Sequence, residues 1–161
     1  MRWLLKPVTT LLFLLVLSVA GALVWNGVPI FSEPGPFSRV YRYLTSNVAE
    51  TLPNHAFPEL VVRCYSGDAD PLYRSLSAAI RDLDWQVVST RPGVFGVDAV
   101  VTTPLLRFKD DVTAELRPAD CGVQLWVRSA SRLGRGDFGA NVSHVMKIVR
   151  AFESRAGVQS L

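Results

Sequence analysis

The chain is 161 residues long, carries a formal net charge of +3 and is 49% hydrophobic, a size and composition that fit one domain and an appendage. Two basic residues, Arg2 and Lys6, precede an apolar run, and from Phe37 onward basic and acidic residues nearly balance. The remaining sequence holds no basic stripe with interleaved aromatic residues, so nucleic acid is excluded as an expected partner.

The apolar run near the N-terminus indicates the compartment. Residues 8–25 contain no charged side chain, and the roughly 23 residues from position 8 to position 30 are enough to cross a bilayer core of about 30 Å. Trp3 and Trp25 bracket the run, and the positive flank precedes it, the pattern of a helix whose N-terminus stays inside the cell. We therefore expect residues 1–30 to be a single-pass anchor in the bacterial inner membrane, with the C-terminal domain in the periplasm.

A cleaved signal peptide is the alternative for residues 1–30. Ser18 and Ala20 supply small residues before Gly21, as a signal-peptidase site requires, and cleavage there would leave a secreted protein. The length of the apolar run favours the retained anchor, because the apolar part of a signal peptide is usually only about 7–15 residues.

Residues 31–58 are expected to form a linker that contains a short amphipathic helix. Proline and glycine at positions 34–36 break the chain after the apolar run. Apolar residues then recur at helical spacing, which indicates a helix lying near the membrane or folded back onto the domain. Arg39 and Arg42 are assigned to its solvated face, and His55 to a solvated, proline-rich loop. The apolar positions are Phe37, Val40, Tyr41, Leu44 and Val48.

Residues 59–161 show the order strand, helix, four strands, helix. The first helix is expected to begin with Asp70 as N-cap and Pro71 at its first position. Short connections make the last four strands an antiparallel meander, and the two amphipathic helices must cover one face. The sequence therefore predicts an α+β fold: an antiparallel sheet of four to five strands covered on one face by two helices, with an N-terminal membrane helix. The strands are expected at 60–65, 86–90, 95–101, 107–117 and 123–131, and the helices at 70–85 and 140–154.

The fourth of these five strands places neighbouring carboxylates on opposite faces. Alternation puts Asp110 on the apolar face, between Phe108 and Val112, and Asp111 on the outer face. The two carboxyl groups therefore do not share a proton or flank one bond as a catalytic pair. A buried, unpaired carboxylate is costly, so we expect a Ser, Asn or Arg from residues 129–141 to satisfy Asp110.

The loop that follows the last strand supports a binding hypothesis. Its glycines turn backbone amides outward just before a helix begins, and two arginines add positive charge. Helix N-termini bind anions, and arginine suits carboxylate or phosphate groups, so the loop predicts a site for a small anionic ligand. Its candidate residues are Arg132, Arg135, Asp137 and Asn141.

A purely structural role is the alternative for the same loop. Asp137 can cap the following helix, Arg132 can pair with Asp137 or Asp111, and the glycines can simply make the turn. The polar and glycine residues around the loop then form a structural network that pins it to the sheet. That network comprises Asp110, Asp111, Ser129, Ser131, Gly134 and Gly139.

The cysteines and histidines do not indicate a metal site. Cys64 and Cys121 lack metal-site spacing, and the histidines add too few convergent ligands, so neither a metal nor another cofactor is expected. An exported domain permits a disulfide between the cysteines, but two unpaired, partly buried thiols are the alternative that we slightly favour. His144 with Ser129 or Ser131 forms a candidate nucleophile–base pair.

Two sequence blocks resemble a known family. The first, R-F-x-D-D-V, spans Arg107 to Val112, and the second, S-x-S-R-x-G-x-x-D-x-G-x-N, spans Ser129 to Asn141. Together they resemble the bacterial, membrane-anchored family catalogued as domain of unknown function fourteen-ninety-nine, over roughly residues 35–152. The resemblance implies a shared site at these positions, and the family has no established activity to carry over.

We therefore expect a non-enzymatic, membrane-anchored module that faces the periplasm and binds an unknown envelope protein or a small anionic ligand. The rival is an envelope hydrolase that uses polar residues of segment 129–144. An open pocket joining Asp110, Arg132 and His144 favours the hydrolase, whereas a filled interface with these groups mutually bonded favours binding. The sequence alone leaves open whether the protein is an enzyme.

Overall fold

The computed structural model describes residues 2–104 and 107–161. Among them, six strands join in one sheet, and four α-helices lie before, between and after these strands. The helices are α1 (Arg2–Asn26), α2 (Pro36–Thr45), α3 (Ala69–Asp82) and α4 (Ala140–Ala156), and the strands are β1 (Val48–Glu50), β2 (Arg63–Tyr65), β3 (Gln86–Arg91), β4 (Gly96–Thr102), β5 (Lys109–Ala119) and β6 (Gly122–Ser131).

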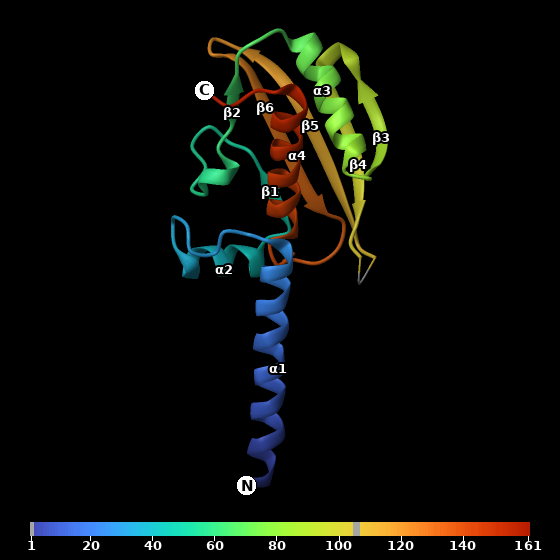
Figure 1. Cartoon of the computed structure of the whole chain (residues 1–161). Coiled ribbons are helices and arrows are strands. Elements are labelled where there is room, and N and C mark those ends of the chain that lie inside the picture. Colours follow the sequence, from blue (N-terminus) through green and yellow to red (C-terminus); the bar gives the residue numbers. More distant parts are fainter. Residues whose placement is uncertain (1, 105–106) are drawn as a thin grey trace.

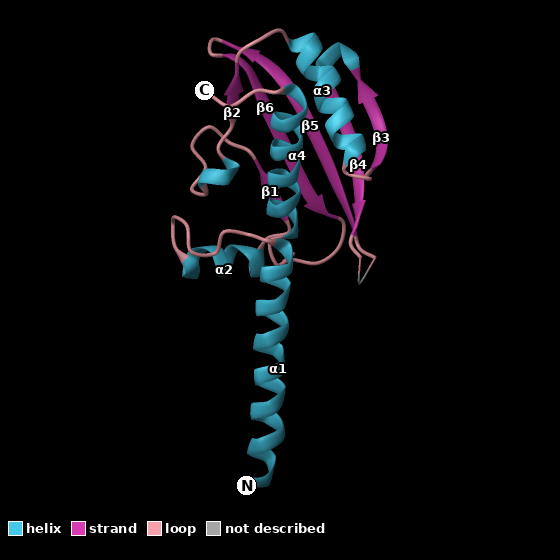
Figure 2. Cartoon of the chain, in the orientation of Figure 1, coloured by secondary structure: helices cyan, strands magenta, loops and turns pink. Residues whose placement is uncertain are grey.

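The sheet and two of the helices form two layers. Helices α3 and α4 lie side by side on one face of the sheet, and α1 projects from the opposite end of the domain to the β5–β6 turn (Figure 1). Figure 2 shows that loops, rather than further strands, connect the first two helices to the sheet. The predicted α+β class, the antiparallel sheet and its cover of two helices are confirmed.

Strands β3 to β6 form the predicted antiparallel meander, in the spatial order β6-β5-β4-β3. The free edge of β6 pairs with two short strands, with β1 near its C-terminal end and with β2 near its N-terminal end. Strand β1 was not predicted, because three residues are too few for an alternation to be recognised. The predicted strand at 60–65 begins only at Arg63, since Pro58–Leu60 form a short 3-10 helix.

The core lies between the sheet and the two helices. Alternate residues of β5 and β6 point at the helices, as the period of two requires. Tyr65 and Phe152 meet edge to face with ring centroids 5.0 Å apart, a geometry that aromatic rings favour. Among the most deeply buried core residues are Leu76, Ile80, Val112, Ala114, Leu116, Leu125, Val145, Ile148 and Phe152.

The boundaries of the two covering helices differ slightly from the prediction. Helix α3 begins at Ala69 with Asp68 as its N-cap, so the assignment of Asp70 as N-cap is wrong by two positions. Asp70 lies instead in the first turn, where its negative charge complements the helix dipole. Helix α4 extends past the predicted end to Ala156 and stops at Gly157, whose φ of 66° suits a left-handed C-terminal residue.

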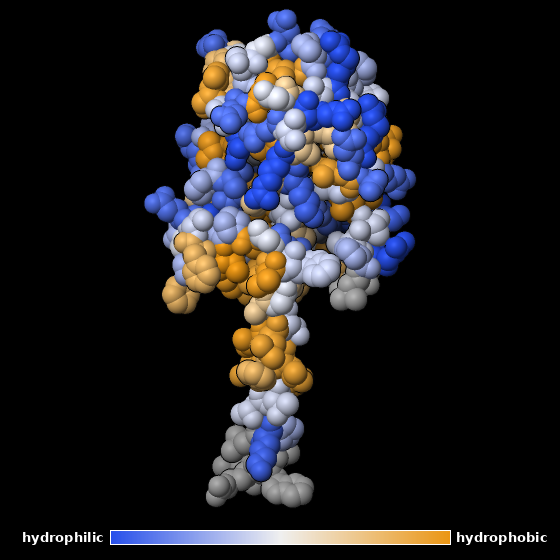
Figure 3. All heavy atoms as spheres, viewed as in Figure 1, coloured by the Kyte–Doolittle hydropathy of each residue, from blue (hydrophilic) through white to orange (hydrophobic). Residues whose placement is uncertain are grey.

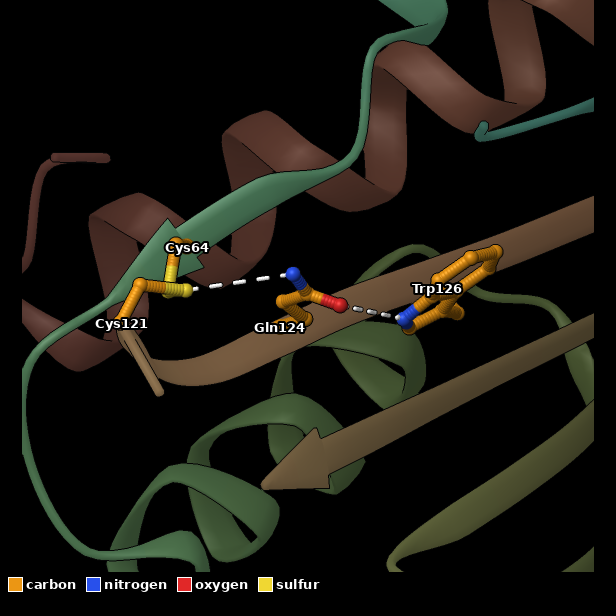
Figure 4. The surroundings of a disulfide bond; sticks show 4 residues. All are labelled: Cys64, Cys121, Gln124 and Trp126. Atoms are coloured by element: carbon orange, nitrogen blue, oxygen red, sulfur yellow. Dashed lines mark hydrogen bonds between the residues drawn. A yellow bond between two sulfur atoms is a disulfide. The ribbon is translucent and has the colours of Figure 1, made fainter. Parts of the chain in front are cut away.

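Cys64 and Cys121 form a disulfide (Figure 4), so the expectation of two unpaired thiols is wrong. Pairing of β2 with β6 sets Cys64 opposite Gln124, which brings its Cα within 6.3 Å of the Cα of Cys121 in the β5–β6 turn. The Gln124 amide donates to Cys121 Sγ at 3.9 Å and accepts from Trp126 Nε1 at 3.1 Å. The bond therefore depends on a long-range strand pairing that the sequence does not reveal.

Helix α1 is joined closely to the domain. Its segment Lys6–Asn26 is long and apolar enough to cross a membrane, with a mean hydropathy of 2.4 and 6% of its residues buried. Leu23 and Val28 are nevertheless buried against the domain, and Asn26 Nδ2 donates to the carbonyl of Phe138 at 2.9 Å. Helix α1, which we call the stalk, is thus connected to the domain by packing as well as by the chain.

Segment 31–58 packs as part of the folded domain and does not merely link it to α1. Tyr43 of α2 is 1% exposed, and β1 joins the sheet. Arg39, assigned to a solvated face, is fully buried, which corrects that assignment. Its guanidinium pairs with Glu59 at 2.6 Å, donates to the hydroxyl of Tyr43 at 3.0 Å and lies over the Phe57 ring.

The burial of Arg39 sets the orientation of α2. Phe37, Tyr41 and Leu44 form the apolar stripe of this helix, yet they are 92%, 71% and 41% exposed. The helix turns Arg39 and Tyr43 towards the domain instead. A buried arginine is tolerated here because a carboxylate and backbone carbonyls satisfy its donors.

Candidate functional site

Most of the predicted site residues lie where the first residues of β5 and the last residues of β6 meet the start of α4. Strand pairing sets Asp110 opposite Ser131 and brings Asp111 beside Ala130. Helix α4 packs over this part of the sheet and contributes Asn141 and His144 from its first turns. Most of these side chains are buried, so their hydrogen bonds decide what the cluster can do.

Asn141 is the centre of a satisfied hydrogen-bond network. Its side-chain oxygen accepts from the hydroxyl of Ser129 at 2.5 Å. Its amide donates to the Ser131 hydroxyl at 2.9 Å, the Asn47 carbonyl at 2.8 Å and a carboxyl oxygen of Asp137 at 2.6 Å. Ser129 and Asn141 are both 0% exposed. The network holds the start of α4 against the sheet.

The side chain of Asp137 accepts hydrogen bonds from backbone amides at the N-terminus of α4. One carboxyl oxygen accepts from the backbone of Gly139 at 2.9 Å and the other from the backbone of Asn141 at 2.8 Å. Burial raises the pKa of the Asp137 carboxyl, and these hydrogen bonds oppose that rise. These bonds agree with the structural alternative for Asp137, and the two amides are already bonded to a carboxylate of the chain itself.

Arg132 and Asp111 form a two-pronged ion pair on the outer face of the sheet. Arg132 Nε lies 2.9 Å from one carboxyl oxygen of Asp111, and its terminal nitrogen lies 2.6 Å from the other. The hydrogen bonds from Arg132 lower the pKa of the Asp111 carboxyl. Both side chains are about half exposed, so solvent screens the pair and it contributes little to stability. Arg135 is the other exposed arginine of this loop.

Asp110 is buried as predicted, with 1% of its surface exposed, and lies opposite Ser131 in the strand pairing. Neither carboxyl oxygen accepts a hydrogen bond from any described residue. Nδ1 of His144 lies 3.7 Å from one carboxyl oxygen of Asp110. The Ser131 hydroxyl nevertheless lies near enough to lower the pKa of the Asp110 carboxyl, so the expectation that a Ser, Asn or Arg of residues 129–141 satisfies Asp110 stays a prediction.

Burial controls the charge of both Asp110 and His144. It raises the pKa of the Asp110 carboxyl, a shift only partly offset by the nearby Ser131 hydroxyl. It also lowers the pKa of His144 to about 4, helped by Lys147. A buried group favours its neutral form, so His144 supplies no positive charge to Asp110 at neutral pH. The two side chains are neighbours without being an ion pair.

The serine, histidine and aspartate of this cluster do not have the geometry of a hydrolase triad. Ser129 Oγ lies 3.2 Å from Nδ1 of His144, and Asp110 approaches that same nitrogen. A catalytic histidine instead uses one ring nitrogen for the serine and the other for the carboxylate. The Trp85 ring packs edge-on against the imidazole, with centroids 5.4 Å apart. The trio is therefore buried and wrongly oriented for attack on a substrate.

A small cavity lies between α2, the loop before β2 and the start of α4. Its volume is about 10 Å³, and Tyr43, His55 and Asp137 supply polar groups to its wall. This is room for about one water molecule, far below the roughly 300–1,000 Å³ of small-molecule sites. His55, expected to be solvated, is partly buried, and its Nδ1 accepts from the backbone of Phe57 at 2.9 Å.

Asn47 is a member of the network that sequence reasoning did not assign to the site. Its side-chain amide donates to the carbonyls of Ser131 and Gly134, at 3.2 and 2.7 Å, while its own carbonyl accepts from Asn141. No periodicity marks such a residue, because it precedes the three-residue strand β1. Among the described residues, no group of three or more His, Cys, Asp or Glu side chains is placed to hold a metal ion.

The fold and this cluster define an α+β domain whose polar residues dock a loop and a helix onto the sheet. The family model described as Protein of unknown function (DUF1499) matches residues 34–152, and the chain belongs to this family. The match confirms the resemblance carried by the two sequence blocks, and it includes α2 and β1 in the family's domain. A comparison with curated proteins finds no match.

Proposed function

We propose that this protein is a single-pass module of the bacterial inner membrane whose folded domain faces the periplasm and works by binding rather than by catalysis. The observation that carries this proposal is α1, a helix of membrane-spanning length that lies outside the domain core except near its C-terminal end, at Leu23. Arg2 and Lys6 precede its apolar part, which favours a cytoplasmic N-terminus. The domain that follows α1 is then on the far side of the membrane.

The disulfide supports export of the domain. Disulfides form and persist in oxidising compartments such as the periplasm and are rare in the cytosol. Cys64 and Cys121 are the two cysteines of the chain, and both take part in the bond. An exported domain therefore accounts for the anchor and the disulfide together.

Binding is favoured over hydrolysis by the state of the polar cluster. Ser129 and Asn141 are hydrogen-bonded to each other. The same ring nitrogen of His144, Nδ1, faces both Ser129 and Asp110. Of the predicted anion-binding residues, Arg132 pairs with Asp111, while Asp137 and Asn141 hold the start of α4. We infer that an anionic ligand or an envelope partner contacts the outside of the loop, through Arg135.

Paired topology reporters test the location. A reporter that is active only after export, fused to the C-terminus of the full chain, is expected to be active. A reporter that fluoresces only in the cytoplasm is expected to be dark at the same position. The reverse result contradicts a periplasmic domain, because the positive flank of α1 would then lie outside.

A thermal-shift measurement tests the binding role of Arg135. Inorganic phosphate is expected to raise the melting temperature of the detergent-solubilised full chain, following mass action at about 2.7 kcal/mol for a ligand concentration a hundredfold above the dissociation constant. Arg135→Ala should remove this shift and leave the ligand-free melting temperature unchanged. Arg150→Ala, a change at an exposed arginine of α4, is the matched control and should keep the shift. No shift in the parent protein at fixed ionic strength would rule out a small-anion site here.

A further inference from the structure

We propose that the end of the domain next to α1 rests in the headgroup region of the membrane that α1 crosses, with α2 lying along the lipid surface. This inference rests on the proposed membrane anchor and extends it from a tethered domain to a docked one. The membrane-facing surface consists of Phe31, Phe37, Tyr41, Leu44, Leu133 and Phe138, all of them exposed.

The orientation of α2 is the first argument. Phe37, Tyr41 and Leu44 recur at helical spacing and form one stripe on the side of the helix away from Arg39 and Tyr43. Soluble proteins rarely leave a contiguous apolar patch of this kind in water. A helix with one apolar face and one polar face lies in a membrane interface with its apolar face in the lipid.

The loop at 132–139 extends the same surface. The backbone amides of Asp137 and Phe138 donate to the carbonyl of Tyr43 at 3.2 and 3.0 Å, which fixes the loop against α2. The loop adds Leu133 and Phe138, which are 66% and 39% exposed. Two segments far apart in the sequence therefore contribute to one apolar surface.

The position of this surface relative to α1 is the second argument. Asn26, the last residue of α1, donates to the carbonyl of Phe138, so the loop lies at the level where the stalk ends. In Figure 1, α2 runs across the direction of α1 at that same level. Hydrophobic atoms gather at the base of the domain around the top of the stalk, while the upper part of this face is mostly hydrophilic (Figure 3).

The side chains at this level suit a lipid interface. Trp25, at the end of the apolar helix, is 80% exposed, and Trp and Tyr are enriched where a membrane meets water. Exposed Arg42 on α2 and Arg135 on the loop supply positive charge for lipid phosphates, which attract basic residues near a membrane. Because the surface surrounds the exit of the anchor, lipid covers it without any partner protein.

Site-directed labelling of the full chain tests the docking. The two cysteines of the chain are joined in the disulfide, so one introduced cysteine can be labelled selectively. We would place an environment-sensitive fluorophore on Phe37→Cys or Tyr41→Cys and reconstitute the protein in vesicles of phosphatidylethanolamine with phosphatidylglycerol. The matched control is Val88→Cys, because Val88 is an apolar residue of β3 with 62% exposure, outside the membrane-facing surface.

The emission maximum of a fluorophore at position 37 or 41 is expected to shift to shorter wavelength in vesicles. Its emission should also be quenched when lipids with a quencher near the headgroup are included. The label at 88 should remain water-like and unquenched. Equal, water-like emission at all three positions overturns the docking. A blue shift that disappears as lipid is added at constant protein identifies contact between two copies of the chain, which also overturns it. Release of the protein from vesicles by alkaline carbonate instead means that α1 does not anchor the chain, a failure of the underlying proposal.

Discussion

Asn141 and Asp110 lie in the same buried cluster but differ in how they are hydrogen-bonded. Asn141 uses both its oxygen and its amide on neighbours from strand β6 and from the loops before β1 and α4. Asp110 accepts no hydrogen bond from the described residues. An unsatisfied buried polar group costs about 1–3 kcal/mol, so the fold keeps Asp110 at a cost in stability.

Asp110→Asn should therefore stabilise the protein at neutral pH, by about 1–3 kcal/mol. The folded-state pKa of Asp110 is raised above its ordinary value of 3.8, so the folded state holds this proton more tightly than the unfolded chain. The parent then loses stability as the pH rises from about 4 through the raised pKa, whereas the variant has no carboxyl to ionise. Denaturant midpoints of parent and variant should converge near pH 4 and separate towards pH 7.

Asp111→Asn is the matched control for this series. The pKa of Asp111 is lowered by Arg132, so its contribution is present above pH 3.8 and is lost as the pH falls, the opposite sign. Because the pair is half exposed and screened by solvent, the midpoint of the variant should fall only slightly below that of the parent at neutral pH. Equal midpoints for the parent and Asp110→Asn at pH 7 would mean that a partner satisfies Asp110 in solution.

For single residues, the sequence predicts which face of the sheet a side chain points to better than it predicts the groups that the side chain bonds to. Two-residue alternation is enough to point Asp110 inward and Asp111 outward, and charge is enough to suggest the pair of Asp111 with Arg132. The partner of Asn141 depends on where α4 docks, which no local pattern encodes. Arg39 was misassigned for a related reason: its buried partner, Glu59, lies 20 residues away along the chain.

Among the elements, the meander β3–β6 and its two covering helices follow from local patterns. Short connections and clear alternation define the strands, and apolar stripes define the helices. Strands β1 and β2 have three residues each and are stable only through their pairing with β6. Their arrangement, and the disulfide that joins β2 to the β5–β6 turn, depend on contacts between distant parts of the chain.

Removal of the disulfide should weaken this long-range arrangement. Replacing Cys64→Ser and Cys121→Ser together is expected to lower the free energy of unfolding by about 2–4 kcal/mol, since the bond closes a long loop in the unfolded chain. Denaturant unfolding of the detergent-solubilised chain measures the loss. A reductant should destabilise the parent by a similar amount and leave the double variant unchanged. A parent insensitive to reductant would show that the bond contributes nothing to stability.

At the scale of the whole molecule, an apolar helix long enough to span a membrane is packed onto the domain at its C-terminal end. Leu23 and Val28 join the domain core, while the rest of the apolar helix stays outside. The sequence predicts the stalk from length and hydropathy alone. It does not predict that this helix packs into the domain, nor that α2 turns its apolar stripe outward, because both helices contact the loop that follows β6.

The most direct test of the account is the intact mass of the full chain extracted from membranes after thiols are blocked in living cells. A retained anchor and an oxidised periplasmic domain predict a chain that begins at residue 1, with no blocked thiol, and that gains two labels only after reduction. A chain that begins at Gly21 would contradict the retained anchor. A chain already carrying two blocked thiols would contradict a domain folded in an oxidising compartment.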